Sequence, residues 1–350
     1  MEGFSFHCIL NIFEILLTIN IIQMKYYILI ILLLPFYYCN SQNVSPEKKI
    51  YDKLFEKVSN EGKWGDKDKR GTVNYIDNNK ILNALKLPKK GISISLSFDI
   101  TQDSSQINHS DFDEVTKYDH QASSLEFRGY DWALDNYSIS YHGFTVSHMD
   151  GLAHLGQGGK LYNGYDASNI TPQGFEELGI EAFNGGIISK GVLIDIPLLY
   201  GKEYLDAGTK ITTEDILKFE EKYNVKIEKG DVVIVRTGRW FEKTVKGDSD
   251  YSKLSAGVDY KIALLLDERQ VSVLGSDGTN DAQPSGIPEE GSPVHKLTLV
   301  SMGMPLLDNL NLEPISKEAI KQNKWEFFIS IQPLRFKGGT GSPVNAIAIF

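Results

Sequence analysis

Two residues in the middle of the chain have the spacing of a metal-chelating pair. His148 and Asp150 are separated by one residue, so both side chains leave the same face of an extended strand. An imidazole nitrogen and a carboxylate oxygen form a borderline-hard ligand set, which suits zinc or manganese. An isolated pair of this kind also occurs as a surface pair or as a hydrogen bond within a strand. The spacing alone therefore leaves a metal site as one of two interpretations.

A third residue nearby can transfer protons. His154 lies four residues after Asp150, and Gly151 between them permits the chain to turn. His154 is thus close enough to act beside a bound ion without necessarily binding it. The run from His148 to His154 is the main candidate site in the sequence.

A second histidine and carboxylate lie far along the chain. His295 follows the glycine- and proline-rich segment 281–293, and Asp308 follows the apolar run 302–307. Both residues are therefore expected at the ends of loops or elements, where functional residues concentrate. A histidine and a carboxylate from a distant segment are what a two-part metal site needs. The alternative is an ordinary exposed His295 and a turn or helix cap at Asp308.

The elements that must position these residues alternate between strands and helices. Strands are predicted from period-two alternation or from short β-branched apolar runs, and helices from apolar periodicity. The predicted elements are the strands 92–98, 191–196, 231–236 and 271–274 and the helices 212–223 and 258–268. Thr212 and Asp215 form a variant of the capping box at the start of the first helix. This alternation favours an α/β class, with 103–134 as a long irregular loop.

The first 41 residues are predicted to be a leader or signal peptide. Residues 9–38 are largely apolar, and Met24 begins a plausible signal peptide of its own, which would make 1–23 an upstream extension. We therefore expect a secreted or periplasmic protein that enters a secretory pathway. The alternatives are an uncleaved membrane anchor and a lipid attached at Cys39. The membrane is expected as a partner only through this leader.

The remaining residues, 42–350, are predicted to form one domain. Both cysteines, Cys8 and Cys39, lie in the leader, so the mature chain has neither a disulfide nor a thiol nucleophile. The net charge is −10 and no cluster of basic residues with interleaved aromatics occurs, which argues against nucleic acid as a partner.

Several motifs in a fixed order make the chain similar to the cyclase family of metal-dependent hydrolases, which includes bacterial kynurenine formamidase and isatin hydrolase. The motifs lie at 64–74, 142–154, 159–164, 230–238, 293–295, 308–312 and 338–343. The first and third of them resemble the longer members of the family. The resemblance implies an α/β fold, a single domain of the swivelling β/β/α type with a mixed sheet. It also implies a small-molecule substrate and a homo-oligomer.

The same resemblance assigns roles to individual residues. His148 and Asp150 match the metal ligands of the family's His-x-Asp motif, and His154 matches its proton-transferring, catalytic histidine. His295 and Asp308 match the distal histidine and carboxylate, although the family more often has Glu at the latter position. The implied cofactor is a divalent metal, Zn or Mn, as one ion or two.

The chain departs from the family pattern at Phe144, where a further ligand histidine usually lies four residues before the one at His148. His142 lies six residues before His148 and reaches the ion only if the strand bends or bulges. The departure leaves open whether the site holds one ion, or two ions with fewer protein ligands and more water. His142 is accordingly the least certain of the candidate ligands.

These observations predict a hydrolase of an amide-type bond in a small molecule. By family analogy the leading activity is that of an arylformamidase, which converts N-formylkynurenine to kynurenine and formate. One alternative is an isatin hydrolase-like or lactone hydrolase that opens a cyclic substrate. Another is an exported binding module with a degraded site, which Phe144 favours and His154 opposes. Asp277 has two interpretations, an acid that faces the substrate from the end of a strand and a turn residue, of which its flanking glycine favours the second. No substrate-binding residue is assigned.

Overall fold

The computed structural model describes residues 44–100 and 118–350. The chain divides into Met1–Ser45 and a unit of Pro46–Phe350, and the fold is that of the second unit. The predicted leader and both cysteines lie outside the described residues, so export stays a prediction. Among the helices of the described ranges, none is long and apolar enough to cross a membrane.

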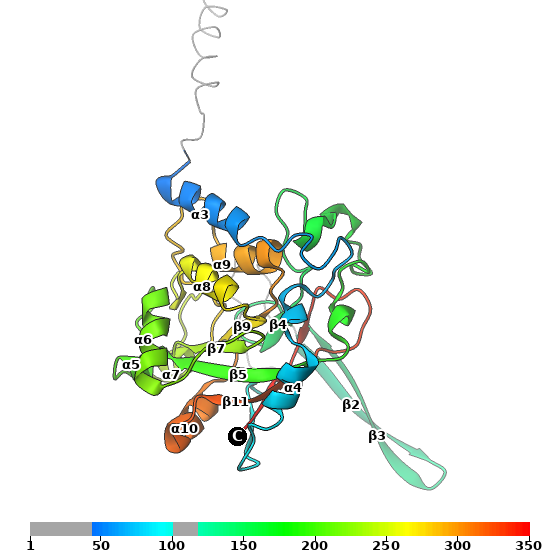
Figure 1. Ribbon diagram of the computed structural model, residues 1–350. Helices are drawn as coiled ribbons and strands as arrows, with labels where there is room; N and C mark the ends of the chain where they lie inside the picture. The colour runs from blue at the N-terminus through cyan, green and yellow to red at the C-terminus, as the bar shows by residue number, and fades with distance from the viewer. Residues whose placement is uncertain (1–43, 101–117) are drawn as a thin grey trace, which may run out of the picture. The chain divides into compact units, whose positions relative to one another are not determined.

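Within the described ranges, nine strands form one mixed sheet in the order β1-β13-β11-β5-β7-β9-β10-β4-β12 (Figure 1). The central strands β5, β7, β9 and β10 pair in parallel, whereas β4 pairs antiparallel with both β10 and β12. The strands of this sheet are β1 (Ser93–Ser95), β4 (His148–Asp150), β5 (Ile187–Asp195), β7 (Val232–Arg236), β9 (Val273–Ser276), β10 (Leu306–Asp308), β11 (Glu326–Ile331), β12 (Gly341–Pro343) and β13 (Ile347–Ile349).

Helices pack on this sheet through their apolar faces. Both α4 and α6 contact β5, and α5 contacts β7. The predicted capping box is present at α6, where Thr212 accepts a hydrogen bond from the Asp215 backbone and the Asp215 side chain accepts one from the Thr212 backbone. The α-helices are α3 (Pro46–Lys57), α4 (Asn78–Ala84), α5 (Ile196–Leu199), α6 (Thr213–Tyr223), α7 (Arg239–Lys246), α8 (Ala263–Glu268), α9 (Pro293–His295) and α10 (Glu313–Gln322).

Short elements complete the connections. The pair β6 (Lys210–Ile211) and β8 (Gly257–Val258) forms a small parallel ladder, and a π-helix, η7 (Lys296–Met302), continues directly from α9. The 3₁₀ turns are η1 (Gly71–Tyr75), η3 (Tyr162–Gly164), η4 (Ala167–Asn169), η5 (Ile180–Phe183) and η6 (Tyr260–Ile262).

The central strands confirm the strand predictions of the second half of the chain, because β5, β7 and β9 overlap the predicted runs and are buried at every residue except the partly buried Ile188. The strand predicted over 92–98 is shorter, because β1 pairs only with the three residues of β13. The helix predicted over 258–268 begins later, as η6 followed by α8.

The long loop predicted over 103–134 is wrong for its second half. Residues 118–139 form a hairpin of β2 (Tyr118–Phe127) and β3 (Tyr130–Ile139), while 103–117 lie outside the described residues. Arg128 and Gly129 at its turn both have positive φ, 54° and 75°. Two positive φ angles are typical of the type I′ turn, whose twist matches that of a hairpin. Arg-Gly is a weaker signal for this turn than Asn-Gly, so the alternation of apolar and polar residues on both sides of it, over 125–134, was missed.

Candidate metal centre

Three carboxylate and imidazole side chains lie on one face of the sheet because β4 is held between two other strands. The residue opposite His148 on β10 is Asp308, and the residue opposite Asp150 on β12 is Gly341. Directly opposed residues place their side chains on the same face, so His148, Asp150 and Asp308 point to one side. Met149 between them is fully buried on the other side. The predicted same-face geometry of His148 and Asp150 is therefore present.

His295 reaches this face from the end of α9, which follows the loop after β9. Its Nε2 lies 3.4 Å from Asp150 Oδ2 and 3.4 Å from Asp308 Oδ2, and its side chain is 12% exposed. The other ring nitrogen, Nδ1, donates to Asp281 Oδ2 at 2.6 Å. A carboxylate in this position fixes the ring and keeps Nε2 directed at the site, as outer partners of ligand histidines do. Sequence reasoning missed Asp281, although an acid in the segment that leads to a candidate ligand is a usable signal.

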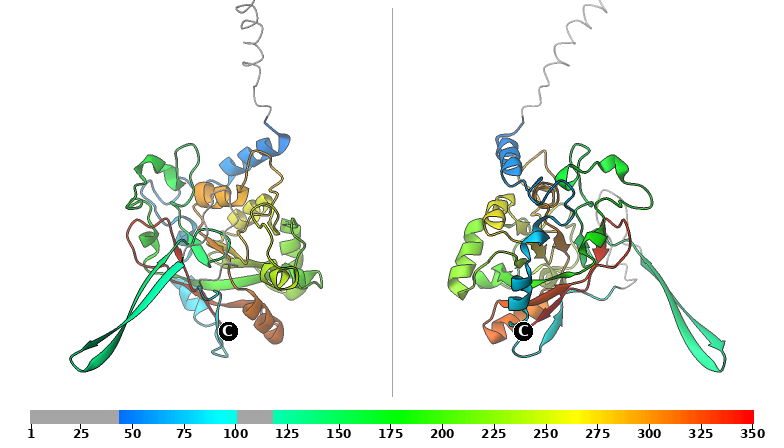
Figure 2. Two further views of the ribbon diagram at one scale, coloured as in Figure 1. Left: turned by 180° about the vertical axis from the view of Figure 1, so that it is seen from behind. Right: turned by 45° about the vertical axis from the view of Figure 1, so that its right-hand side comes forward.

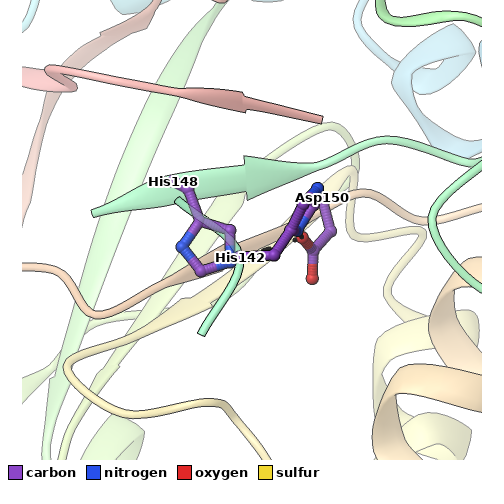
Figure 3. A group of neighbouring side chains, drawn as sticks. All are labelled: His142, His148 and Asp150. Carbon is purple, nitrogen blue, oxygen red and sulfur yellow. Dashed lines mark ion pairs between the residues drawn. The ribbon is translucent and has the colours of Figure 1, made fainter. Parts of the chain in front are cut away.

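His142 reaches the site through a bend between β3 and β4. Its Nδ1 lies 3.1 Å from Asp150 Oδ1, and Figure 3 shows the His142 ring beside the His148 ring and the Asp150 carboxylate. The bend passes through Gly143, whose φ of 149° is one that residues with side chains rarely adopt. The bend that His142 requires is therefore present. His142 places a nitrogen atom at the site, whereas the side chain of Phe144 has no atom that can bind a metal.

Arg239 and Asn309 hold this bend. Asn309 Nδ2 donates to the carbonyl oxygens of Gly143 at 2.7 Å and of Val146 at 3.2 Å. Arg239 donates to Asn309 Oδ1 at 2.6 Å and also to the carbonyl oxygen of Phe144. These two side chains therefore fix the backbone that carries His142. The sequence offered no signal for Arg239, whereas Asn309 is the direct neighbour of a candidate ligand.

The Arg239 side chain is itself buried. The residue is 5% exposed, and its guanidinium lies 3.9 Å from the ring centre of Tyr251 and 4.5 Å from that of Trp240. Both are distances at which a cation is attracted to an aromatic face. Arg239 is thus a rigid positioning residue rather than a member of the donor set.

Asp277 fixes the turn that leads to Arg239. Its carboxylate accepts hydrogen bonds from the backbone N–H groups of Thr237 at 2.9 Å and Gly238 at 2.8 Å, and from the Thr237 hydroxyl at 2.8 Å. These contacts direct the Asp277 carboxylate to the backbone of a distant turn, which opposes the interpretation that it faces a substrate.

The structure brings all five predicted ligands together as two donor groups that share Asp150. One group is His142, His148 and Asp150, the other is Asp150, His295 and Asp308, and within each group the ligand atoms lie within 4.8 Å of one another. Asp150 Oδ1 faces His148 Nε2 at 3.4 Å, whereas Asp150 Oδ2 faces His295. The shared carboxylate gives the arrangement room for one ion in either group or for two ions bridged by Asp150.

The residues of both groups fit a divalent metal. The two oxygens of Asp150 are buried, and within the described ranges neither receives a hydrogen bond. A buried charged oxygen without a hydrogen bond is costly unless something else compensates it, and a cation does so. His148 donates its Nδ1 hydrogen to the Val146 carbonyl oxygen at 2.7 Å, so Nε2 is left to act as a ligand.

His154 lies beside the donor groups. Its Nε2 is 3.8 Å from Asp150 Oδ2, and its ring stacks on that of His142 with centroids 4.1 Å apart. The side chain keeps 29% of its surface exposed, which leaves it accessible to a substrate. Burial, supported by the nearby His142, lowers the pKa of His154 to about 4. In the metal-free protein at neutral pH the ring is therefore uncharged and able to accept a proton.

His295 differs from His154 in its protonation. Burial disfavours a charge on His295, but the carboxylates of Asp308 and Asp150 outweigh burial and raise its pKa well above the usual range. At neutral pH the metal-free site therefore holds a proton that a bound cation must displace.

This displacement predicts the pH dependence of metal binding. Below the pKa of His295 the proton competes with the cation, so the affinity for Zn²⁺ should rise with pH by about tenfold per unit for each proton displaced. Zn²⁺ titrations against a competing chelator at several pH values measure this slope. Calorimetry in buffers with different ionisation heats should detect protons released on binding. An affinity that does not change with pH would contradict the assignment of His295 as a ligand.

A conservative change at Arg239 tests the bend. Arg239→Lys keeps the positive charge but cannot make the planar pair of contacts to Asn309 and to the Phe144 carbonyl. We expect metal affinity to fall by about tenfold or more, as for other outer partners of metal ligands. Arg269→Lys is the matched control, because Arg269 contacts Ile227 and Glu220 away from the site. Unchanged affinity in a folded Arg239→Lys protein would show that the bend does not depend on Arg239.

A family model described as a putative cyclase matches residues 92–281, which is more than half of the chain. The chain belongs to the cyclase family. The matched region of the chain contains His142, His148, Asp150 and His154, whereas His295 and Asp308 lie beyond its end. The structure shows that His295 and Asp308 lie beside Asp150 of the family's His-x-Asp motif.

Solved structures of similar proteins confirm the predicted α/β domain with a mixed sheet. A crystal structure of a novel cyclase is 27% identical, with a TM-score of 0.74, and the match covers 84% of this chain and 100% of the other. Isatin hydrolase A from Labrenzia aggregata is 23% identical, with a TM-score of 0.52, and the match covers 73% of this chain and 93% of the other.

A further similar structure is an isatin hydrolase bound to the product analogue thioisatinate. It is 18% identical, with a TM-score of 0.53, and the match covers 78% of this chain and 98% of the other. At these identities the two isatin hydrolases show that this chain shares their fold, and nothing more. A search among curated proteins found no match.

Proposed function

We propose that this cyclase-family protein is a metal-dependent hydrolase that opens an amide-type bond in a small molecule. The observation that carries the proposal is the pair of donor groups sharing Asp150, with the partly exposed His154 beside them. When bound, a divalent ion such as Zn²⁺ or Mn²⁺ supplies an acidified water and polarises the substrate carbonyl.

The residues of the chain supply the remaining chemistry. His154 Nε2 accepts a proton from the attacking water and then donates it to the leaving nitrogen. The depressed pKa of His154 keeps it in the basic form before the first of these steps. Asp281 and the Val146 carbonyl hold the rings of His295 and His148 in their orientations throughout.

Two substrate classes are supported in different ways. The resemblance to kynurenine formamidase favours an arylformamidase that releases formate from N-formylkynurenine. The fold shared with isatin hydrolases favours a second candidate, the opening of a cyclic amide. A binding module with a degraded site loses its main support, because His142 provides a donor beside the position where Phe144 has none.

A hydrolysis panel combined with metal removal tests the proposal. The purified chain should contain zinc or manganese by elemental analysis, and chelation followed by dialysis should abolish hydrolysis of N-formylkynurenine or of isatin. Adding back Zn²⁺ or Mn²⁺ should restore it. A simple lactone serves as a third substrate that needs no protonation of a nitrogen leaving group. Bound metal without hydrolysis of any of the three would contradict the proposed activity, whereas hydrolysis unaffected by metal removal would contradict the mechanism.

A further inference from the structure

A buried amide contacts the carboxylate of Asp308. Asn280 is 1% exposed, and its Nδ2 donates to Asp308 Oδ1 at 2.6 Å and to the carbonyl oxygen of Leu307 at 3.1 Å. A carbonyl oxygen can only accept a hydrogen bond, so it is the amide nitrogen of Asn280 that faces β10. Both hydrogens of the amide are therefore directed at the end of the strand that carries Asp308.

This contact divides the two oxygens of Asp308 between different partners. Oδ1 accepts the hydrogen bond from Asn280, whereas Oδ2 lies 3.4 Å from His295 Nε2. A carboxylate turns easily about its last bond, because that torsion has broad minima. The short contact to Asn280 restricts this rotation and leaves Oδ2 as the oxygen that faces His295.

The loop that carries Asn280 connects β9 to α9 and so leads to His295. In both views of Figure 2, α9 and η7 (orange) lie between α3 (blue) and the sheet. The Asn280 carbonyl oxygen accepts a hydrogen bond from the N–H group of Val258 in β8 at 2.8 Å, which fixes the backbone of the loop. Asn280 therefore holds Asp308 from a segment that is itself held in place.

The backbone at Asn280 does not by itself require asparagine. Its φ of 57° lies in the left-handed region, which glycine adopts without strain and asparagine more readily than most residues. The buried Oδ1 of Asn280 receives no hydrogen bond within the described ranges, and this costs free energy that a glycine would avoid. The two N–H donors directed at β10 are thus what asparagine adds at this position.

We propose that Asn280 is a positioning residue that directs Asp308 to bind the cation through Oδ2 alone. The proposal rests on the metal centre of the proposed function. A carboxylate that binds through one oxygen uses one position of the ion, whereas a bidentate carboxylate uses two. Catalytic metal sites keep a position open for water or substrate. Asn280 therefore preserves such a position in the group of Asp150, His295 and Asp308.

Substitution by glycine tests the amide without straining the backbone. Asn280→Gly removes both N–H donors at a φ of 57° that glycine adopts freely. Asn224→Gly is the matched control, because Asn224 has a φ of 48° at the end of α6, which contacts β5 away from the site. In titrations against a competing chelator, the Kd for Zn²⁺ should rise about tenfold or more in Asn280→Gly, as for other outer partners of metal ligands. It should stay within about twofold of the wild-type value in the control.

A second background separates positioning from a general effect on the fold. In Asp308→Ala the amide has no carboxylate to hold, so adding Asn280→Gly should change the Kd for Zn²⁺ by less than about twofold. A purely structural role would raise the Kd by the same factor in both backgrounds and would overturn the proposal. An unchanged Kd in Asn280→Gly alone would also overturn it and leave the metal centre intact. A wild type that binds no Zn²⁺ would overturn this proposal and the proposed function together.

A crystal structure of the Zn²⁺-loaded wild type keeps the proposal falsifiable if Asn280→Gly fails to fold. We expect Asp308 to bind the ion through Oδ2, with Asn280 Nδ2 still donating to Oδ1. An ion bound through Oδ1, through both oxygens or without Asp308 would overturn the proposal.

Discussion

The His154→Ala protein is expected to retain its metal and to hydrolyse its amide substrate about 100- to 10,000-fold more slowly than the wild type. His154 Nε2 lies 3.8 Å from Asp150 Oδ2, and His154 belongs to neither donor group. This variant lacks the ring proposed to take the proton of the attacking water and to return it to the leaving nitrogen. The loss should therefore fall on kcat rather than on metal content.

A change of leaving group separates the two proton transfers. A lactone or ester needs no protonated nitrogen to depart, so His154→Ala should slow its hydrolysis less than that of an amide. His120→Ala is the control, because His120 is an exposed residue on β2 that pairs with Asp135. Full turnover in His154→Ala would remove His154 from the mechanism. Loss of metal together with turnover would make it a ligand instead.

Much of the site was predictable because it depends on local geometry. The period of two along a strand places His148 and Asp150 on one face. Asp308 joins that face only through the pairing of β10 with β4, a long-range contact. The positions of His295 after a glycine- and proline-rich segment and of Asp308 after an apolar run identified both as candidates before their partners were known. In the structure these residues lie within contact distance of Asp150.

The remaining features depend on contacts between distant parts of the chain. The position of His142 requires the unusual φ of Gly143 and the hydrogen bonds from Arg239 and Asn309, which lie far away in the sequence. Asp281 was hidden because its role appears only when His295 is seen beside it. Similarly, the hairpin of β2 and β3 depends on a turn at Arg128 that local propensity does not favour.

The shared carboxylate leads to the second large expected effect. Asp150→Asn keeps the size of the side chain but replaces a charged acceptor by a neutral amide. Because Asp150 Oδ1 faces His142 and His148 while Oδ2 faces His295, this one change removes an anionic ligand from both donor groups. We expect metal content close to zero and hydrolysis reduced by at least about 1,000-fold.

The comparison that makes this result specific is Asp308→Asn. Asp308 belongs only to the group with His295, so its loss should weaken that group and leave His142, His148 and Asp150 as a donor set. If two ions bind, elemental analysis should find about one ion in Asp308→Asn and none in Asp150→Asn. If one ion binds, equal losses in both variants place it with His295, and loss in Asp150→Asn alone places it with His142. Full metal content in Asp150→Asn would show that the ion is held without the carboxylate around which both groups are built.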